Sequence, residues 1–455
     1  MTDLLLKKYN VPVPRYTSYP PANYFSTDFK ATDLVTAMAE ANEVENNKIS
    51  FYIHIPFCKH LCHYCGCNSW PMAKKEQVER YINALHQEID KVCEQIDPKR
   101  EIAQIHYGGG SPSSIPLHFL QELNEQLLSK FKTIEKPEIA IECHPGYLKE
   151  EDWHMLLAAG FNRFSLGIQD FNEEVLHVVN RRPSLLPVAE IVAILRAAGA
   201  TINMDFIYGL PLQTMESFTT TIEKAIALRP DRLVTFSYAH VPWVNKRQLI
   251  LERAGLPDNT TKQALFDKAA SLLQEAGYQP IGMDHFVLPT DELNLALQAG
   301  ELHRNFQGYC TRRTTGQVYA FGASAIYQLD TAYAQNEKDL ATYIEMVEKG
   351  ELPTARGYSL SYTEQITREV IETWMCNEAI HWKELAERMN RSVKEIQVAV
   401  LVNIPQLQEL VADELILWDE QGIEMTPKGK PFIRNVAAAL DALMLHNTQR
   451  YSKPL

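Results

Sequence analysis

The sequence predicts an α/β protein built on a partial, open barrel of six βα units, with an extended amino-terminal arm and a mostly helical, winged-helix-like carboxy-terminal domain. Three observations lead to this fold. Short β-branched or aromatic runs alternate with helical patterns over residues 49–241, prolines and aromatic residues crowd residues 10–25, and helical patterns dominate beyond Gly357. Steady alternation of strand and helix implies parallel strands with right-handed crossovers. Six units are too few for a closed eightfold barrel.

The barrel strands are expected where these short runs end against turn residues. They fall at residues 49–57, 101–109, 138–145, 162–169, 201–210 and 232–241. Between the first two strands, apolar residues recur at three- and four-residue spacing, which indicates one face of a helix. These residues are Val78, Tyr81, Ile82, Leu85, Ile89 and Val92. Similar patterns predict helices near residues 117–131, 185–199 and 218–228.

The chain is expected to divide into three parts: an arm over residues 1–32, a catalytic domain over 33–356 and a helical domain over 357–455. Prolines in the arm leave little room for a helix. The last part is expected to contain three helices, a short hairpin and a final helix. The three helices are predicted at residues 363–379, 381–389 and 392–411, and the hairpin at 415–429.

The composition limits the classes of partner. The chain has 455 residues, 45% of them hydrophobic and 22% charged, as in ordinary globular proteins. We find neither a signal peptide nor a run of 18 uncharged apolar residues, so we expect a cytoplasmic protein with no membrane partner. A formal net charge of −13 gives no global attraction to nucleic acid, so none is expected as a partner, and we expect a monomer.

Four of the eight cysteines lie within ten residues, directly after the first predicted strand. These are Cys58, Cys62, Cys65 and Cys67. Three thiolates at spacings of four and three can bind three irons of one cubane and leave the fourth iron open to a chelating substrate. The alternatives are a zinc site that uses all four cysteines and reactive thiols without metal. Zinc prefers better separated pairs of ligands, so the cubane is favoured.

Two further patterns surround this loop. Gly108, Gly109 and Gly110 end the second strand, where glycine lets the backbone approach a ligand closely; a tight turn is the alternative interpretation. Polar residues occur at or near the carboxyl ends of other strands, where βα barrels collect their reactive groups. They are Glu142, Gln169, Asp205 and His240. Together with the cysteine loop they favour a site over solvated turn residues.

The cysteine spacing resembles the signature of the radical S-adenosylmethionine superfamily. Further motifs, spread over nearly the whole chain, resemble the coproporphyrinogen dehydrogenase family within it. The motifs are PRYTSYP at 14–20, YIHIPFC at 52–58, CGCN at 65–68, GGGSP at 108–112, GIQDFN at 167–172, VNRRP at 179–183, DFIYGLP at 205–211, SYAHVP at 237–242, IGMDHF at 281–286 and NFQGY at 305–309.

The resemblance implies a 4Fe-4S cluster held by Cys58, Cys62 and Cys65, and two molecules of S-adenosylmethionine. It assigns the first molecule to Tyr52, Gly109, Glu142 and Ile326. It assigns the second molecule to Tyr64, Gly110, Ser111, Gln169, Arg181, Asp205 and Ala239. Tyr52, Cys67, Glu142 and Arg181 are expected to be catalytic. Tyr64 and Ser111 stand where the family often has phenylalanine and threonine, and they keep an aromatic ring and a hydroxyl.

The reaction that the resemblance implies is the anaerobic conversion of two propionates of coproporphyrinogen III into vinyl groups in haem biosynthesis. A low-potential electron donor is a further implied partner. Four carboxylates entering an acidic protein require local cations, for which Arg15, Arg181 and Arg304 are the candidates. A haem-binding chaperone of the same family, a winged-helix DNA-binding regulator and a zinc-dependent enzyme are the alternatives. The CGCN stretch and the PRYTSYP arm favour an enzyme that carries out this oxidation over the chaperone.

Overall fold

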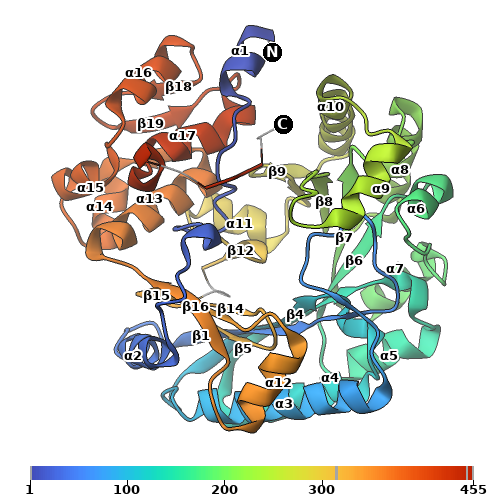
Figure 1. Ribbon diagram of the computed structural model, residues 1–455. Helices are drawn as coiled ribbons and strands as arrows, with labels where there is room; N and C mark the ends of the chain where they lie inside the picture. The colour runs from blue at the N-terminus through green and yellow to red at the C-terminus, as the bar shows by residue number, and fades with distance from the viewer. Residues whose placement is uncertain (1–2, 313–315, 447–448, 453–455) are drawn as a thin grey trace.

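The centre of the protein is a partial barrel of parallel strands (Figure 1). The structure is a computed structural model that describes residues 3–312, 316–446 and 449–452. The six predicted strands are present and each pairs in parallel with the next in the chain. They are β1 (Lys48–Ile55), β4 (Glu101–Gly109), β5 (Lys132–Cys143), β6 (Arg163–Gln169), β7 (Thr201–Tyr208) and β8 (Arg232–Ser237). The predicted open α/β barrel is confirmed.

Helices cover the outer face of this barrel and fill the gaps between its strands in the chain. Every apolar residue predicted to line one face of the first helix is buried in α3 (Lys75–Cys93). The other covering helices are α4 (His118–Lys130), α5 (Glu150–Ala158), α6 (Glu173–Val178), α7 (Val188–Ala197) and α8 (Met215–Leu228). The inner side chains of α4, α5, α7 and α8 share one large apolar core with the strands, and Val175 of α6 packs in a smaller one. The core therefore fixes the strand ends from which the site is built.

The sheet extends beyond the six predicted strands on both sides. On the β1 side, β13 (Gln317–Phe321) pairs in parallel and is followed by antiparallel strands. These are β14 (Ile326–Gln328), β15 (Ala332–Asn336) and β16 (Thr354–Ser359). On the β8 side lie β10 (His285–Val287) and β9 (Gln279–Ile281), both antiparallel. No pairing between the described ends of the sheet closes the barrel.

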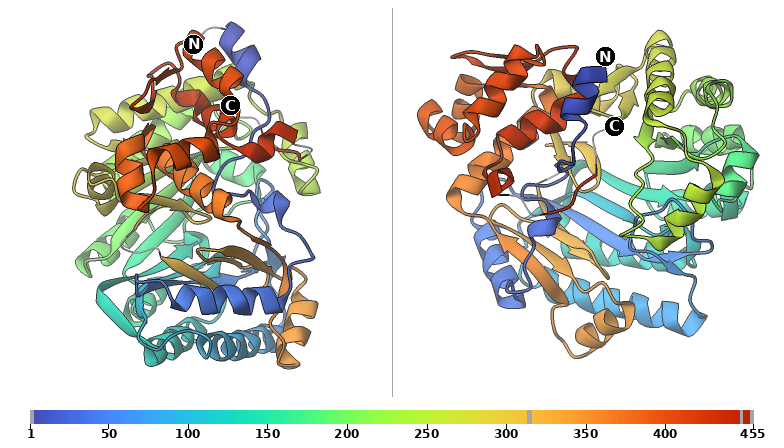
Figure 2. Two further views of the ribbon diagram at one scale, coloured as in Figure 1. Left: turned by 90° about the vertical axis from the view of Figure 1, so that its left-hand side faces the viewer. Right: turned by 45° about the horizontal axis from the view of Figure 1, so that its top comes forward.

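Several elements join this sheet to the rest of the chain. A hairpin of β11 (Leu302–Asn305) and β12 (Gly308–Thr311) projects between the barrel and the carboxy-terminal helices. The helices α9 (Leu249–Ala254), α10 (Asn259–Glu275), α11 (Glu292–Gln298) and α12 (Leu340–Glu348) complete this part. Figure 2 shows the carboxy-terminal helices stacked on one side of the barrel in both views.

The amino-terminal arm is only partly as predicted. Residues 10–21 have no helix, but the structure places a helix, α1 (Asp3–Tyr9), before them and begins α2 (Ala31–Asn42) inside the predicted arm. The expectation of an extended arm throughout is therefore wrong at both ends. The reason is that neither short segment contains proline, and Leu5 and Tyr9 of α1 bury their side chains against the carboxy-terminal part.

The carboxy-terminal part has the predicted helices and hairpin. They are α13 (Tyr362–Asn377), α14 (Trp382–Met389), α15 (Val393–Val400), α16 (Ile404–Ala412), α17 (Ile433–Ala439) and the hairpin β18 (Ile416–Trp418) with β19 (Gly422–Met425). A third strand, β17 (Ala379–His381), joins the hairpin. The single helix predicted at 392–411 is two, because Pro405 starts a new helix in its first turn. The domain boundaries remain a prediction.

None of the described helices is both long and apolar enough to cross a lipid bilayer.

Candidate active site

The cysteine loop follows β1 and returns to the barrel through main-chain hydrogen bonds. Cys58 ends β2 (Phe57–Cys58), which pairs with β3 (Trp70–Pro71). The N–H of Met72 donates to the carbonyl of Cys58 at 2.8 Å, and the N–H of Ser111 donates to the carbonyl of Phe57 at 3.0 Å. The loop is therefore fixed at its base to the segment that follows β4, while Gly66 and Cys67 are exposed.

The sulfur atoms of the loop receive donors that suit thiolates. The side chain and the N–H of Cys67 both donate to Cys65 and lower the pKa of that thiol to about 6. Arg181 Nη1 lies 3.6 Å from Cys62 Sγ. Burial acts the other way at Cys58 and raises the pKa of its thiol to about 12. Hydrogen bonds and cations of this kind favour bound thiolates over thiols.

In the part of the chain that the structure describes, no three His, Cys, Asp or Glu side chains converge closely enough to hold a single metal ion. A cubane is held by separate thiolates, one to each iron, so its ligands need not converge on one point. Cys58, Cys62 and Cys65, with Cys67 beside them, form a donor set of the right chemistry for it.

The three glycines at the end of β4 form a floor that a side chain would block. A Cβ on Gly108 would lie 2.8 Å from Glu142 Oε1, and one on Gly109 would lie 2.6 Å from the His54 ring. Gly109 also has a φ of +112°, a conformation that side chains rarely adopt. A Cβ on Gly110 would lie 2.7 Å from the Pro56 backbone. The glycines are therefore required for this close packing, not only for a turn.

A cavity of about 390 Å³ opens above this floor. It is lined by all four residues predicted for the first cofactor molecule, Tyr52, Gly109, Glu142 and Ile326, and also by Cys67. Asn305, Phe306 and Gln307 of the β11–β12 turn line it from the opposite side. The buried Oε1 of Gln307 has no hydrogen-bond partner within the described residues. The cavity thus joins the cysteine loop to residues far away in the sequence.

Two histidines hold the cavity's polar residues in place. His54 Nδ1 lies 3.2 Å from the Tyr52 hydroxyl, and its Nε2 lies 2.9 Å from the Asn68 carbonyl. His106 Nε2 lies 3.2 Å from Glu142 Oε1. Burial raises the pKa of Tyr52 and lowers the pKa of His54, so both stay neutral at pH 7. The sequence analysis missed both histidines, although alternation along β1 places His54 on the same face as Tyr52.

Arg181 is the centre of a second group of predicted residues. Its guanidinium donates to the Tyr64 hydroxyl at 3.0 Å and to the carbonyl of Gly167. Burial lowers the pKa of Arg181, but Tyr64 and Cys62 outweigh it and raise the pKa above its ordinary value. Gln248 donates to the carbonyls of Tyr64 and Ala239 at 3.0 and 3.3 Å. Sequence reasoning did not single out Gln248.

Gln169 and Asp205 lie beside this group. Gln169 has a φ of +69°, and its buried Oε1 has no partner among the described residues. Asp205 is opposite Gly167 in the β6–β7 register. The carboxylate of Asp205 accepts hydrogen bonds from Ser165 Oγ and Asn203 Nδ2, both at 2.8 Å, while burial raises its pKa.

Of the remaining predicted residues, two lie by the cysteine loop and one lies elsewhere. Gly110 packs against Cys58, with its added Cβ 3.0 Å from that sulfur, and Ser111 is buried next to it. His240 belongs to another contact, since its ring bonds the Tyr238 hydroxyl at 3.0 Å and faces Glu252 at 3.8 Å. The structure therefore does not bring His240 into the cavity.

Two of the three arginines proposed for propionates lie near each other. Burial lowers the pKa of Arg15, and the charge of Arg304 lowers it further, while Asp284 opposes both. Arg304 donates to the Tyr309 hydroxyl at 3.0 Å, and its buried Nε has no partner in the described ranges. Arg181 belongs instead to the cysteine loop, so the three arginines do not form one cluster.

Comparison with known proteins agrees with this geometry. Residues 52–225 match the model of the Radical SAM superfamily. The oxygen-independent coproporphyrinogen III oxidases of Synechocystis and Escherichia coli K12 are 36% and 37% identical to the chain, with 98% and 97% of this chain and 96% and 95% of theirs covered. The chain belongs to the oxygen-independent coproporphyrinogen III oxidase family. A solved structure, coproporphyrinogen III oxidase (HemN) from Escherichia coli, superposes with a TM-score of 0.89 at 36% identity, covering 97% of this chain and 99% of that one.

Membership of the oxygen-independent coproporphyrinogen III oxidase family makes the chain a radical S-adenosylmethionine oxidoreductase of haem biosynthesis, with a 4Fe-4S cluster. The residues present fit both cofactors. The cysteine loop supplies thiolates with donors around them, and the glycine floor leaves a cavity that a Cβ would fill. Unpartnered polar atoms of Gln169 and Gln307 are available to a ligand.

Proposed function

We propose that the protein decarboxylates two propionates of coproporphyrinogen III to vinyl groups, which gives protoporphyrinogen IX without oxygen. The observation that carries this proposal is the single cavity in which Cys67 of the cysteine loop lies together with Tyr52, Gly109, Glu142 and Ile326. The full-length similarity to oxidases of this name supports the choice of substrate.

Cys58, Cys62 and Cys65 would hold the cluster, and Cys67 lies beside it without being a ligand. When bound, the cluster and S-adenosylmethionine supply a 5′-deoxyadenosyl radical. Glu142, held by His106, offers a carboxylate to ribose hydroxyl groups, and the main chain at Gly109 offers close approach to the methionine end. Tyr52 stays protonated because of its burial, so it can donate a hydrogen bond.

A second S-adenosylmethionine would be held by the group around Arg181. The set comprises Tyr64, Gly110, Ser111, Gln169, Arg181, Asp205 and Ala239. The guanidinium of Arg181 suits the carboxylate of the ligand, and Gln169 offers its unpartnered oxygen. Asp205, fixed by Ser165 and Asn203, suits a ribose hydroxyl. None of these seven residues is among those that line the cavity, which leaves them for a second molecule.

For each propionate, the carbon next to the ring would give up one hydrogen atom to the 5′-deoxyadenosyl radical that the bound cofactors supply. The resulting substrate radical then loses carbon dioxide and one electron, and the carbon–carbon double bond of the vinyl group forms. Arg15 and Arg304 would bind propionates, because their charges lie near each other and Arg304 Nε is free of protein partners among the described residues. A separate acceptor takes the electron.

The test is an anaerobic assay with reductant, S-adenosylmethionine, coproporphyrinogen III and an electron acceptor. We expect release of two molecules of carbon dioxide for each protoporphyrinogen IX formed, and none with Cys58→Ala. The haem-chaperone alternative expects a different result: tight binding of haem and no carbon dioxide while the cluster is intact. That result would replace the oxidase with the chaperone.

A further inference from the structure

The outer side of the cysteine loop carries a cluster of basic and aromatic side chains, here named the basic collar. It consists of Lys59, His60, Tyr147 and Arg182. The rings of His60 and Tyr147 are stacked at 5.7 Å, and His60 Nδ1 lies 2.5 Å from the Tyr147 hydroxyl. Lys59 Nζ and Arg182 Cζ lie 5.2 and 5.4 Å from the centre of the Tyr147 ring. Cation–π contacts of this kind hold two like charges near one point.

Two chain segments of the basic collar adjoin residues that are proposed ligands of the iron–sulfur cluster or contact one of them. Lys59 and His60 follow Cys58 directly, and Arg182 follows Arg181, whose guanidinium reaches Cys62. Two hydrogen bonds tie these segments together: the His63 N–H donates to the Val179 carbonyl at 2.9 Å, and Asn180 Nδ2 donates to the Leu61 carbonyl at 3.0 Å. The collar is therefore joined to the loop that carries Cys58 and Cys62.

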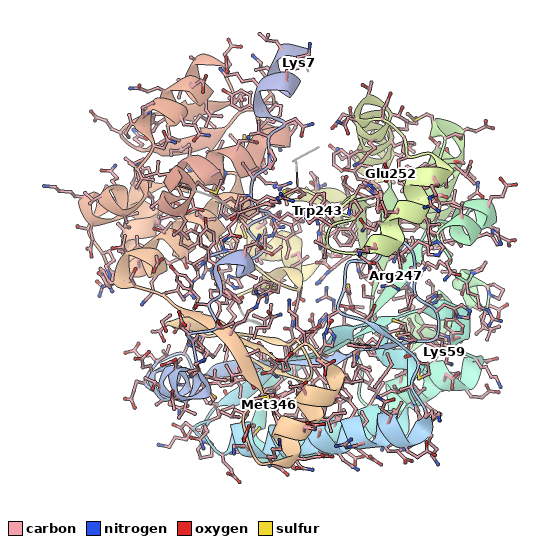
Figure 3. The ribbon with its side chains drawn as sticks, in the orientation of Figure 1. Lys7, Lys59, Trp243, Arg247, Glu252 and Met346 are labelled. Atoms are coloured by element: carbon pink, nitrogen blue, oxygen red, sulfur yellow. The ribbon has the colours of Figure 1, made fainter. Side chains whose placement is uncertain are left out.

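The collar faces solvent, whereas the other end of the loop faces the cavity. Lys59, His60 and Arg182 are exposed, and Figure 3 labels Lys59 on the right-hand side of the barrel part. Gly66 and Cys67, at the other end, line the cavity of the proposed active site. The loop can thus be approached from solvent without passing through the space that S-adenosylmethionine and substrate need.

We propose that the basic collar is the docking surface for a small, acidic one-electron carrier protein that reduces the cluster. The proposal rests on the proposed function only in requiring a cluster in this loop. One electron leaves the reduced carrier and enters the cluster, and no bond or proton changes place. Electron transfer slows steeply with distance, so the carrier must dock close to the ligands, and the exposed Lys59 and His60 directly follow Cys58.

Charge decides the chemistry of the partner. The chain carries a formal net charge of −13, so an acidic carrier is repelled by the protein as a whole and needs a local basic patch to bind. Complementary charge steers such encounters and fixes their orientation, and its effect weakens with added salt. The collar is a basic patch next to the loop that carries the ligands.

The experiment uses reduced flavodoxin as the acidic carrier and the double variant with Lys59→Glu and Arg182→Glu. The dissociation constant of flavodoxin from the immobilised double variant should be at least ~10-fold higher than from wild type at low salt. The rate of cluster reduction by flavodoxin should fall by about the same factor. Reduction by dithionite, a small ion that needs no docking surface, should be within about twofold of wild type.

Lys132→Glu is the matched control, because Lys132 is an exposed lysine at the opposite end of β5 from Tyr147. It should leave flavodoxin binding unchanged. If the glutamate substitutions cause loss of the iron–sulfur cluster, the single variant Arg182→Gln is used instead. Flavodoxin binding to it can be measured whether or not the cluster is present. Unchanged binding by the collar variants, an equal loss with Lys132→Glu, or wild-type binding that does not respond to salt would each overturn the proposal. None of these readouts uses coproporphyrinogen, so a wrong substrate assignment would not affect them.

Discussion

The amino-terminal arm and the cysteine loop are both irregular segments, yet they are held in opposite ways. In the arm, Tyr16 and Tyr19 are 3% and 1% exposed and pack into the apolar cluster of the carboxy-terminal helices. In the cysteine loop, Gly66 and Cys67 are exposed, and hydrogen bonds to backbone and sulfur accompany the apolar packing of Tyr64. The arm is therefore ordered by its own apolar side chains, whereas the loop depends on polar contacts and on the cluster it would bind.

This difference predicts which substitutions should affect cluster binding and catalysis, and which should affect the stability of the fold. Substitutions in the loop remove ligands and donors but little buried apolar surface. Substitutions in the arm remove buried contacts that lie away from the cysteines. Four predictions test this separation.

The largest effect is expected from the cysteines. Cys58→Ala, Cys62→Ala and Cys65→Ala should each abolish the visible absorption of the cluster, because each removes one of three iron ligands. Cys67→Ala should keep it. Anaerobic iron and sulfide analysis with absorption spectra measures this. Equal loss of the cluster in all four variants would contradict the three-ligand assignment.

Asp205→Asn should keep the cluster but lower the rate of decarboxylation by about tenfold or more, because it weakens an acceptor for a ribose hydroxyl. Carbon dioxide release per cluster is the measurement. Ser165→Ala is the control: it removes one donor to Asp205 and keeps the carboxylate, so its effect should be smaller. A rate for Asp205→Asn equal to wild type would remove Asp205 from the site.

In the arm, Tyr16→Phe removes the hydroxyl that donates to Asp441 at 2.9 Å. The free energy of unfolding should fall by about 1–3 kcal/mol, because a buried acceptor loses its donor. Denaturant titration checks this, and the cluster absorption should not change. Tyr362→Phe is the matched control: its exposed hydroxyl contacts Glu395, so the change should be within ~0.5 kcal/mol.

The last prediction concerns pH. Burial raises the pKa of Asp441 to about 6 from an ordinary value of 3.8. The folded protein therefore binds this proton more tightly than the unfolded chain, so the contribution of Asp441 is full below about pH 4 and declines as pH rises to about 6 and beyond. The free energy of unfolding of wild type minus that of Asp441→Asn should fall by about 2–3 kcal/mol from pH 4 to 7. A difference that stays flat or rises would refute the shift.

The six parallel strands could be predicted from the sequence because strands buried on both faces are nearly continuous apolar runs. Each observed strand begins or ends within a few residues of its predicted range, except β5, which begins at Lys132, six residues early. The strands β9, β10 and β13–β16 were not predicted. Most have three to five residues, and runs so short carry no clear periodicity.

For the site, too, only patterns within one segment of the chain could be predicted from the sequence. The cysteine loop and the glycines are local signals, so the sequence suffices for them. The roles of Tyr52, Glu142 and Ile326 came from family resemblance, and their meeting in one cavity depends on β14 lying across the sheet from β5. The bond between His106 and Glu142 depends on the pairing of β4 with β5, which no single-segment pattern contains.

The packing of the arm against the carboxy-terminal helices has a consequence for synthesis on the ribosome. Leu5, Tyr9, Val13, Tyr16 and Tyr19 share their apolar cluster with side chains between Ile366 and Leu440. Because a chain emerges from its amino end, these first side chains wait without partners until the last helices have left the exit tunnel, while the barrel between them can already fold. A stalled or truncated nascent chain would therefore display the arm as a free hydrophobic segment, a ready target for chaperones and proteases.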